Sequence, residues 1–292
     1  MGSPVVVERA EAGVGQRSRV LRLRRLRLGR RLAPILLGPL YRTYTARLRR
    51  EVRRASPPNH VAVILDGNRR WASLAGLAEP GAGHRRGADK IDELLCWCAD
   101  LGIGEVTVWA LSNENLARSE AELSALHEIL ADKLAALSER AHGHAPRMRI
   151  RVFGRFGALP ERLSETIEKV EAQTADHEGL TLNVALGYSG RDELVDATRA
   201  LIRSLAARGI PAEEMLDQVT SEALASHLYT AAHSDPDLII RTSGEMRLSG
   251  FLPWQSMHSE FYFTDVYWPA FRELDFLRAV RTFQQRERRF GR

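Results

Sequence analysis

Short apolar runs alternate with longer segments of helical periodicity, and this alternation limits the fold more than any other feature of the sequence. The apolar runs predict strands at residues 60–66, 105–112, 148–154, 180–188 and 237–242. The segments between them predict helices at residues 88–102, 119–141, 159–175 and 191–209. Apolar strands that alternate with helices are typical of a parallel sheet covered on both faces. We therefore expect an α/β fold with a mostly parallel central sheet flanked by helices.

Charge divides the chain into a basic N-terminal segment and a mildly acidic body. Residues 1–56 carry fifteen Arg and three Glu, a net charge of +12, which leaves −7 for the other residues of a chain whose net charge is +5. With 44% hydrophobic side chains, residues 57–292 are long enough to form one large domain or two small ones. We predict a single catalytic domain there, preceded by an extension that is rich in Arg and Leu.

The basic extension has three interpretations, namely membrane contact, nucleic-acid contact or disorder. Its leucines favour the surface of an anionic membrane, because a nucleic-acid arm does not need an apolar face. The acidic body, which lacks interleaved aromatic and basic residues, argues against a nucleic-acid-binding protein. The chain has no apolar run of the ~20 residues that a membrane span needs, and no secretory signal. The expected location is cytoplasmic, with peripheral contact at the inner face of the cell membrane.

Polar residues follow several of the predicted strands, where ligands bind in open parallel sheets. These clusters are 66–70, 112–118, 187–191 and 241–249, and each combines arginine with Gly, Ser or Asn. Guanidinium groups, hydroxyls and backbone amides are suited to phosphate, and the donors suffice for two phosphate-bearing ligands. Asp66 and Ser112 are also common helix caps, so neither identifies a site alone.

Familiar nucleotide and zinc motifs are missing. There is no G-x-x-x-x-G-K-[ST], and GAGHRRG at 81–87 only approximates the dinucleotide motif, without a strand directly before it. Cys96 and Cys98 have no second pair to complete a zinc site, and we interpret them as reduced helix residues. The acids Asp66 and Glu260 are instead candidates to hold Mg²⁺ against diphosphate oxygens.

Six motifs in order resemble the cis-prenyltransferases, the undecaprenyl diphosphate synthase family. They are HVAVILDGNRRWA, GHRRGADKI, ALSNENLAR, LNVALGYSGRDEL, DPDLIIRTSGEMRLSGFLPWQ and SEFYFTDVYWPAF, and the resemblance extends from about residue 60 to the C-terminus. It implies a homodimer with an apolar tunnel that condenses isopentenyl diphosphate with geranyl or farnesyl diphosphate to give a Z-configured product. Among family members, the chain looks most like the actinobacterial enzymes that make Z,E-farnesyl diphosphate.

The resemblance also implies a role for each site residue. Asp66 would hold Mg²⁺ together with Glu260, and Ser112 and Asn115 would align the acceptor and assist loss of its proton. Gly67, Asn68, Arg69, Arg70 and Trp71 would bind the allylic diphosphate. The remaining substrate-binding residues would be His84, Arg118, Arg241, Arg247, Ser249, Arg289 and Gly291, of which the last two would reach a partner subunit's diphosphate site.

Product length is the property that the sequence defines least. Ala110 lies at a position of the tunnel wall where a short-chain relative has a larger residue. Its small side chain therefore leaves space for a longer product. Leu130, Leu134 and Leu137 on the following helix are the alternative barrier. We expect a short product, with a long-chain undecaprenyl or decaprenyl synthase as the alternative. A non-catalytic partner subunit is a further alternative, which the intact Asp-Gly-Asn motif opposes.

Several residues depart from the family pattern. Glu79 stands near a place where many relatives carry an arginine for the allylic diphosphate, and Leu116 replaces a common tryptophan. Met246, Pro253 and His258 also differ from the usual residues. None of these changes removes a predicted ligand, so we expect an active enzyme.

Overall fold

The computed structural model describes residues 38–79, 81–141, 148–157 and 159–286, without the side chains of residues 116, 117, 140 and 141. The chain divides into two compact units, Met1–Arg50 and Glu51–Arg292. Of the basic extension, residues 1–37 lie outside the described residues, and a helix runs through residues 38–52. Gln284 donates hydrogen bonds to the carbonyl oxygens of Val52, Ala55 and Ser56, which ties residues 52–56 to the C-terminal part of the same second unit.

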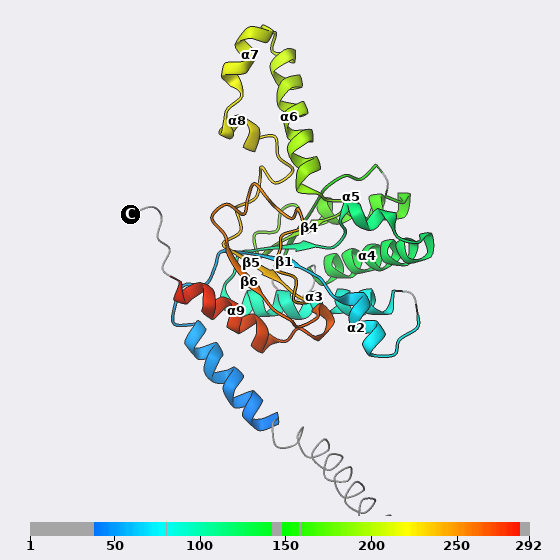
Figure 1. The fold of residues 1–292 in the computed structure, drawn as a ribbon, viewed down its shortest axis with the longest axis vertical. Helices are drawn as coiled ribbons and strands as arrows, with labels where there is room; N and C mark the ends of the chain where they lie inside the picture. The colour runs from blue at the N-terminus through cyan, green and yellow to red at the C-terminus, as the bar shows by residue number, and fades with distance from the viewer. Residues whose placement is uncertain (1–37, 80, 142–147, 158, 287–292) are drawn as a thin grey trace, which may run out of the picture. The chain divides into compact units, whose positions relative to one another are not determined.

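A parallel sheet forms the centre of the second unit (Figure 1). Within the described residues it has six strands in the order β3-β4-β2-β1-β5-β6. The strands are β1 (His60–Ile64), β2 (Glu105–Trp109), β3 (Arg149–Phe153), β4 (Thr181–Ala185), β5 (Leu238–Arg241) and β6 (Glu260–Phe263). The five strands predicted from the sequence are confirmed with shorter ends, whereas β6 was not predicted.

The helices connect the strands and extend beyond them. They are α2 (Asn68–Leu74), α3 (Ala82–Leu101), α4 (Glu120–Ala141), α5 (Glu161–Thr174), α6 (Gly190–Ala207), α7 (Ala212–Gln218), α8 (Ser221–Ala225) and α9 (Glu273–Gln285), with short 3-10 helices η1 (Asn113–Ala117) and η2 (Trp268–Ala270). Gly102 ends α3 with φ 75°, as the sequence predicts. At the start of α4, the Glu122 amide lies 3.4 Å from the Ser119 hydroxyl, and the Glu122 carboxylate accepts from Arg118.

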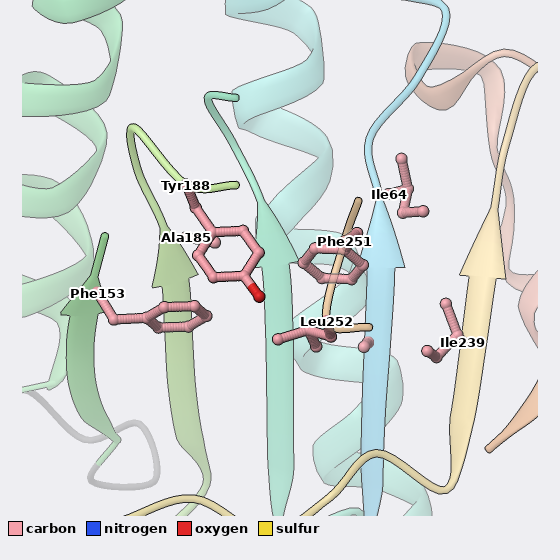
Figure 2. Close-up of a cluster of buried hydrophobic side chains, with 8 residues drawn as sticks. Ile64, Phe153, Ala185, Tyr188, Ile239, Phe251 and Leu252 are labelled. Carbon is pink, nitrogen blue, oxygen red and sulfur yellow. The ribbon is translucent and has the colours of Figure 1, made fainter. Parts of the chain in front are cut away.

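The two faces of the sheet are covered differently. Helix α9 packs along β5 and β6 on one face, and α5 packs against the edge strand β3, whose Ile150 and Val152 amides donate to Thr174 and Glu171. The opposite face carries an apolar cluster in which Phe251 and Leu252 cover the strand residues, beside Tyr188 (Figure 2). Trp109 stacks on Phe251 with ring centroids 5.1 Å apart. Residues 251 and 252, which lie outside any helix or strand, therefore cover this face of the sheet, whereas α9 covers the other.

A buried hydrogen-bond network joins β1, β2 and β4. The His60 ring nitrogen Nδ1 lies 2.7 Å from the Ser234 carbonyl oxygen, so Nδ1 donates. Nε2 then accepts from the Thr107 hydroxyl at 2.7 Å, and Asn183 donates to Thr107 and to Glu105. Burial lowers the pKa of His60, against the raising effect of Glu105. The network therefore holds His60 as a neutral imidazole.

Candidate functional site

The carboxyl ends of β1, β2 and β5 meet at a cavity of about 830 Å³, a size typical of small-molecule sites. Parallel pairing brings these ends together, because Ile64 is opposite both Trp109 and Arg241. The predicted site residues that line the cavity are Asp66, Gly67, Asn68, Arg69, Arg70, His84, Ser112, Asn115, Arg118, Arg241, Arg247 and Ser249. Residues that lie far apart in the sequence thus share one wall.

Asp66 is held at the end of β1 by backbone and side-chain contacts. Its amide donates to the Thr242 hydroxyl at 3.0 Å, and its carbonyl accepts from the Trp268 amide at 3.0 Å. One carboxylate oxygen accepts from the Gly67 amide at 2.9 Å, and the other accepts from Arg241 at 3.0 Å. Gly67 begins α2 with φ 101°, a left-handed conformation that favours glycine. The carboxylate is therefore fixed before any ligand binds.

The loop after β5 supplies a second set of cationic groups. Arg241, only 5% exposed, donates to the Ser249 hydroxyl at 2.8 Å and to the Arg247 carbonyl. Glu245 lies 2.7 Å from the Arg247 guanidinium and 3.6 Å from that of Arg70. The carboxylates align the arginines, and a guanidinium has five N–H donors, so several remain available for a ligand.

A third set comes from η1 and α3. The Ser112 hydroxyl accepts from the Asn115 side-chain amide at 2.7 Å, and the bond fixes the two side chains to one another. Arg118 donates to Glu122 at 3.1 Å and lies 3.3 Å from the His84 ring nitrogen Nε2. Burial, followed by the charge of Arg118, lowers the pKa of His84. His84 is therefore a neutral ring at the cavity wall.

The cavity has a net positive wall. Of the described residues that line it, five are arginines and three are carboxylates. An excess of guanidinium groups in a recessed site favours polyanionic ligands such as diphosphates, and arginine contacts phosphate oxygens in pairs. The wall also includes Ile64, Trp109 and Ala110, which offer apolar contact beside the charged groups. The site is suited to an amphiphilic molecule with an anionic head.

Some predicted site residues do not line this cavity. Trp71 lies on α2 but is absent from the wall, and Arg289 and Gly291 lie outside the described residues. Glu260 begins β6 opposite Leu238, at the amino edge of the sheet, and its carboxylate accepts from Arg286. Phe263, the β6 residue level with the end of β1, is three positions further, or ~10 Å. Within one chain, Asp66 and Glu260 therefore do not share a metal ion.

The cluster at 187–191 is also not part of the wall. Tyr188 is fully buried, and its hydroxyl donates to Glu193 at 2.7 Å. Gly187 has φ 54°, and a Cβ there would meet the Arg155 carbonyl oxygen at 2.6 Å. These residues serve the close approach of two strand ends, and we correct the prediction that they contribute to the phosphate site.

Three polar wall residues were not predicted as site residues, namely Ser73, Glu114 and Glu245. Glu114 and Glu245 lie inside the SNEN and RTSGEMR segments that drew attention to their neighbours. A carboxylate repels phosphate, so the residue types that predict a phosphate site exclude both acids, although Glu245 pairs with Arg70 and Arg247. Ser73 lies one turn beyond Arg70 on α2, and helical spacing could have identified it.

The departures from the family pattern are found around the site. Glu79 pairs with Arg85, and neither lines the cavity. Met246 is 79% exposed on the loop between the two arginines. Leu116 lies in η1, and its side chain is outside the description. Neither Glu79 nor Met246 displaces a cationic group of the wall.

The described residues contain no group of three His, Cys, Asp or Glu side chains that could hold a metal ion. Of the three carboxylates that line the cavity, Asp66 is the one that contacts both Arg70 and Arg241. Mg²⁺ is commonly held by one or two carboxylates together with substrate phosphates and water. The residues present thus fit an ion that arrives with its diphosphate, and they do not form a complete protein cage.

Comparisons with known proteins agree with this geometry. The family model "Putative undecaprenyl diphosphate synthase" matches residues 64–291. Isoprenyl transferase 1 of Corynebacterium efficiens is 49% identical over 88% of this chain and 98% of its own length. The (2Z,6E)-farnesyl diphosphate synthase of Thermobifida fusca is 49% identical over 88% of this chain and 99% of its own.

A solved structure has the same fold. It is lavandulyl diphosphate synthase from Lavandula x intermedia in complex with dimethylallyl diphosphate, with a TM-score of 0.75 and 34% identity. The match covers 81% of this chain and 99% of that one. The α/β fold with parallel strands, the cationic cavity wall and the relatives lead to one assignment. The chain belongs to the undecaprenyl diphosphate synthase family and is an isoprenyl transferase.

Proposed function

We propose that the protein condenses isopentenyl diphosphate with an allylic diphosphate to give a short Z-configured prenyl diphosphate of the Z,E-farnesyl type. The observation that carries this proposal is the contact of Asp66 with both the Arg70 and Arg241 guanidinium groups in one cavity. One carboxylate between two cationic groups suits a reaction in which a diphosphate leaves beside a second, bound diphosphate. The names of the two relatives agree with prenyl transfer.

The donor and acceptor diphosphates would bind to opposite groups of the wall. Gly67, Asn68, Arg69 and Arg70, from the start of α2, are assigned to the allylic donor. Arg241, Arg247 and Ser249, from the end of β5 and its loop, are assigned to isopentenyl diphosphate. Positioning and charge stabilisation then account for most of the catalysis, because the allylic centre becomes cation-like as the donor diphosphate departs.

Bond formation requires loss of one proton from the acceptor. The donor's C1–oxygen bond breaks, the new bond joins donor C1 to the terminal methylene carbon of the acceptor, and a proton leaves to form the Z double bond. The hydrogen-bonded pair of Ser112 and Asn115 lies on the wall and is assigned to align the acceptor for this step. His84, held neutral, and Arg118 are assigned to hold diphosphate oxygens.

Mg²⁺ is the proposed cofactor. When bound, the ion neutralises charge on the leaving diphosphate and so favours its departure. Asp66 would hold the ion from the protein side. Glu260 of the same chain lies at the other edge of the sheet, so any part that it plays with the metal would require a second subunit.

A homodimer is proposed from the exposed apolar residues of the projecting helices α6 and α7 (Figure 1). Val195 and Ile202 are two turns apart on α6 and are 45% and 47% exposed, and Leu216 on α7 is 77% exposed. Apolar side chains at helical spacing on a projecting surface are typical of subunit contacts. Light scattering should give twice the chain mass, and Ile202→Arg should give the mass of one chain.

Contact with an anionic membrane is proposed for the basic helix 38–52. Its exposed residues include Arg42, Arg47 and Arg50, together with Leu40 and Tyr44. Within the described part of the chain, the helices are too short or too polar to cross a membrane. The proposed location is the cytoplasm and its membrane surface. Sedimentation with vesicles that contain phosphatidylglycerol should retain the full chain and release a chain that begins at Glu51.

The activity is tested by incubating the purified protein with Mg²⁺, labelled isopentenyl diphosphate and geranyl diphosphate. We expect a short product with a new Z double bond. Asp66→Ala should reduce its formation by at least about 100-fold, because the variant lacks the carboxylate proposed to hold Mg²⁺ beside the leaving diphosphate. A ladder of long products would replace the short-chain proposal with a lipid-carrier synthase. Absence of product from both geranyl and farnesyl diphosphate would leave a non-catalytic partner subunit.

A further inference from the structure

The loop between β6 and η2 is hydrogen-bonded to the segments that follow β1 and β5. Its path is fixed by backbone hydrogen bonds from the Ser243 amide to the Val266 carbonyl, at 2.9 Å, and from the Trp268 amide to the Asp66 carbonyl, at 3.0 Å. Tyr267 stands between these two attachments. Its ring therefore occupies a fixed place next to the Asp66–Gly67 turn, although it does not line the cavity.

The Tyr267 ring contacts the turn that begins α2. A Cβ at Gly67 would lie 2.6 Å from the ring carbon Cδ1, so the ring touches the glycine directly. Gly67 has φ 101°, which aims the following residues of α2 toward the cavity. The ring thus packs against the backbone that carries Asn68, Arg69 and Arg70.

The same ring supports one arginine of the wall. The Arg70 guanidinium carbon lies 5.5 Å from the centroid of the Tyr267 ring. Arg70 also donates to the Ser243 hydroxyl at 2.7 Å, and it lies 3.7 Å from Asp66 and 3.6 Å from Glu245. Its side chain is 47% exposed, so the ion pairs alone hold it weakly. A flat ring adds attraction and restricts the side-chain rotamers before the ligand arrives.

We propose that Tyr267 is a positioning residue for the allylic diphosphate, because it holds Arg70 and the Asp66–Gly67 turn in their binding geometry. This inference rests on the proposed function, which assigns Arg70 to the donor. The ring contacts Arg70 and the Gly67 turn, which are both assigned to the donor, so its loss should affect the donor more than the acceptor. Tyr267 acts through Arg70 and does not touch the reacting atoms.

The test compares Tyr267→Leu with Tyr267→Phe. Leucine retains apolar bulk against Gly67 but has no aromatic face, so the KM for geranyl diphosphate should rise by about 2- to 30-fold, as expected for loss of a cation–π contact. The KM for isopentenyl diphosphate and kcat at saturating donor should change by less than about twofold. Phenylalanine restores the ring and should restore most of the donor affinity.

Direct binding separates this inference from the proposed activity. Calorimetry with geranyl thiolodiphosphate, which keeps the diphosphate group but ionises slowly, needs no turnover. The Leu variant should bind this probe more weakly than the wild type by the same factor. In an Arg70→Ala background, Tyr267→Leu should add less than about twofold, because the contact it removes is already gone.

A matched control is Tyr262→Leu, the same substitution at a half-buried tyrosine of β6. It should leave both KM values within about twofold of the wild type. The inference is overturned if Tyr267→Leu binds the thiolodiphosphate as well as the wild type, if it raises both KM values equally, or if its effect is undiminished without Arg70. Failure of the wild type to make any product, with normal probe binding and the expected Leu defect, would refute the proposed activity alone.

Discussion

Arg241 offers the sharpest test of the proposed acceptor site, because it is buried at the end of β5 and has defined partners on both sides. One terminal nitrogen donates to the Ser249 hydroxyl at 2.8 Å, and the other donates to Asp66 at 3.0 Å. In Arg241→Lys the positive charge remains, but a single ammonium replaces the planar fork. It cannot reach Ser249, Asp66 and a diphosphate together.

The structure gives the size of the expected loss. At least one hydrogen bond to a charged group is left unmade in the Lys variant, which costs about 1.5–3 kcal/mol. If that bond contributes to transition-state binding, kcat/KM for isopentenyl diphosphate falls by roughly 10- to 150-fold. The KM for the allylic donor should change less, because the residues proposed to bind the donor lie at the start of α2.

Steady-state kinetics with each substrate varied in turn measure this loss, and urea unfolding shows whether the variant is folded. The matched control is Arg162→Lys, since Arg162 forms exposed ion pairs with Glu128 and Asp132 on the protein surface. It should change neither kinetics nor stability measurably. A value of kcat/KM for Arg241→Lys within threefold of the wild type would refute the assignment of the fork to the acceptor.

Three further predictions concern His60, Leu134 and Asn113. Folding stability should fall by at most about 1.4 kcal/mol between pH 7.5 and 5.5 from His60, because burial lowers its pKa and the unfolded imidazole takes up a proton that the folded one does not; urea unfolding of His60→Gln should lack this component. Leu134, one of the three leucines predicted as the alternative barrier to chain growth, is buried. Leu134→Ala should lengthen the product by one or more isoprene units, as measured by chromatography, at a stability cost of about 2–5 kcal/mol. Asn113→Ala should lower kcat/KM about fivefold, because it removes the bond to Asp192 that anchors η1, and the melting temperature should remain near that of the wild type.

The alternation of apolar runs and helices predicted most of the sheet, and its failures have physical reasons. Continuous apolar runs mark strands buried on both faces, which is the situation of β1, β2, β4 and β5. Strand β6 lies at the edge of the sheet, where its four residues are only half-buried. Its first residue, Glu260, was interpreted as a metal ligand, so the strand that begins there was not predicted.

The sequence around 187–191 shows why a polar motif at a strand end can mislead. Gly187, Ser189 and Gly190 have the composition of a phosphate loop, but the structure uses two of them for close packing. A Cβ on Gly190 would meet Pro253 at 2.1 Å, and its amide donates to the Gly250 carbonyl. A glycine at such a position indicates that another group approaches the backbone closely. It does not say whether that neighbour is a ligand or another part of the chain.

The loop from Ser243 to Leu252 explains why the site's geometry is not visible in its residue types. Ser243, Ser249 and Leu252 have φ values of 75°, 53° and 47°, a region that side-chain-bearing residues rarely adopt. The surroundings hold each of them: the Ser243 amide donates to Val266, Ser249 accepts from Arg241, and Leu252 is 1% exposed in the core. Strain of about 1–3 kcal/mol per residue is thus offset by tertiary contacts. The two arginines can be predicted from the sequence. That Arg241 and Arg247 line the same cavity as Asp66 depends on these tertiary contacts, which the sequence does not show.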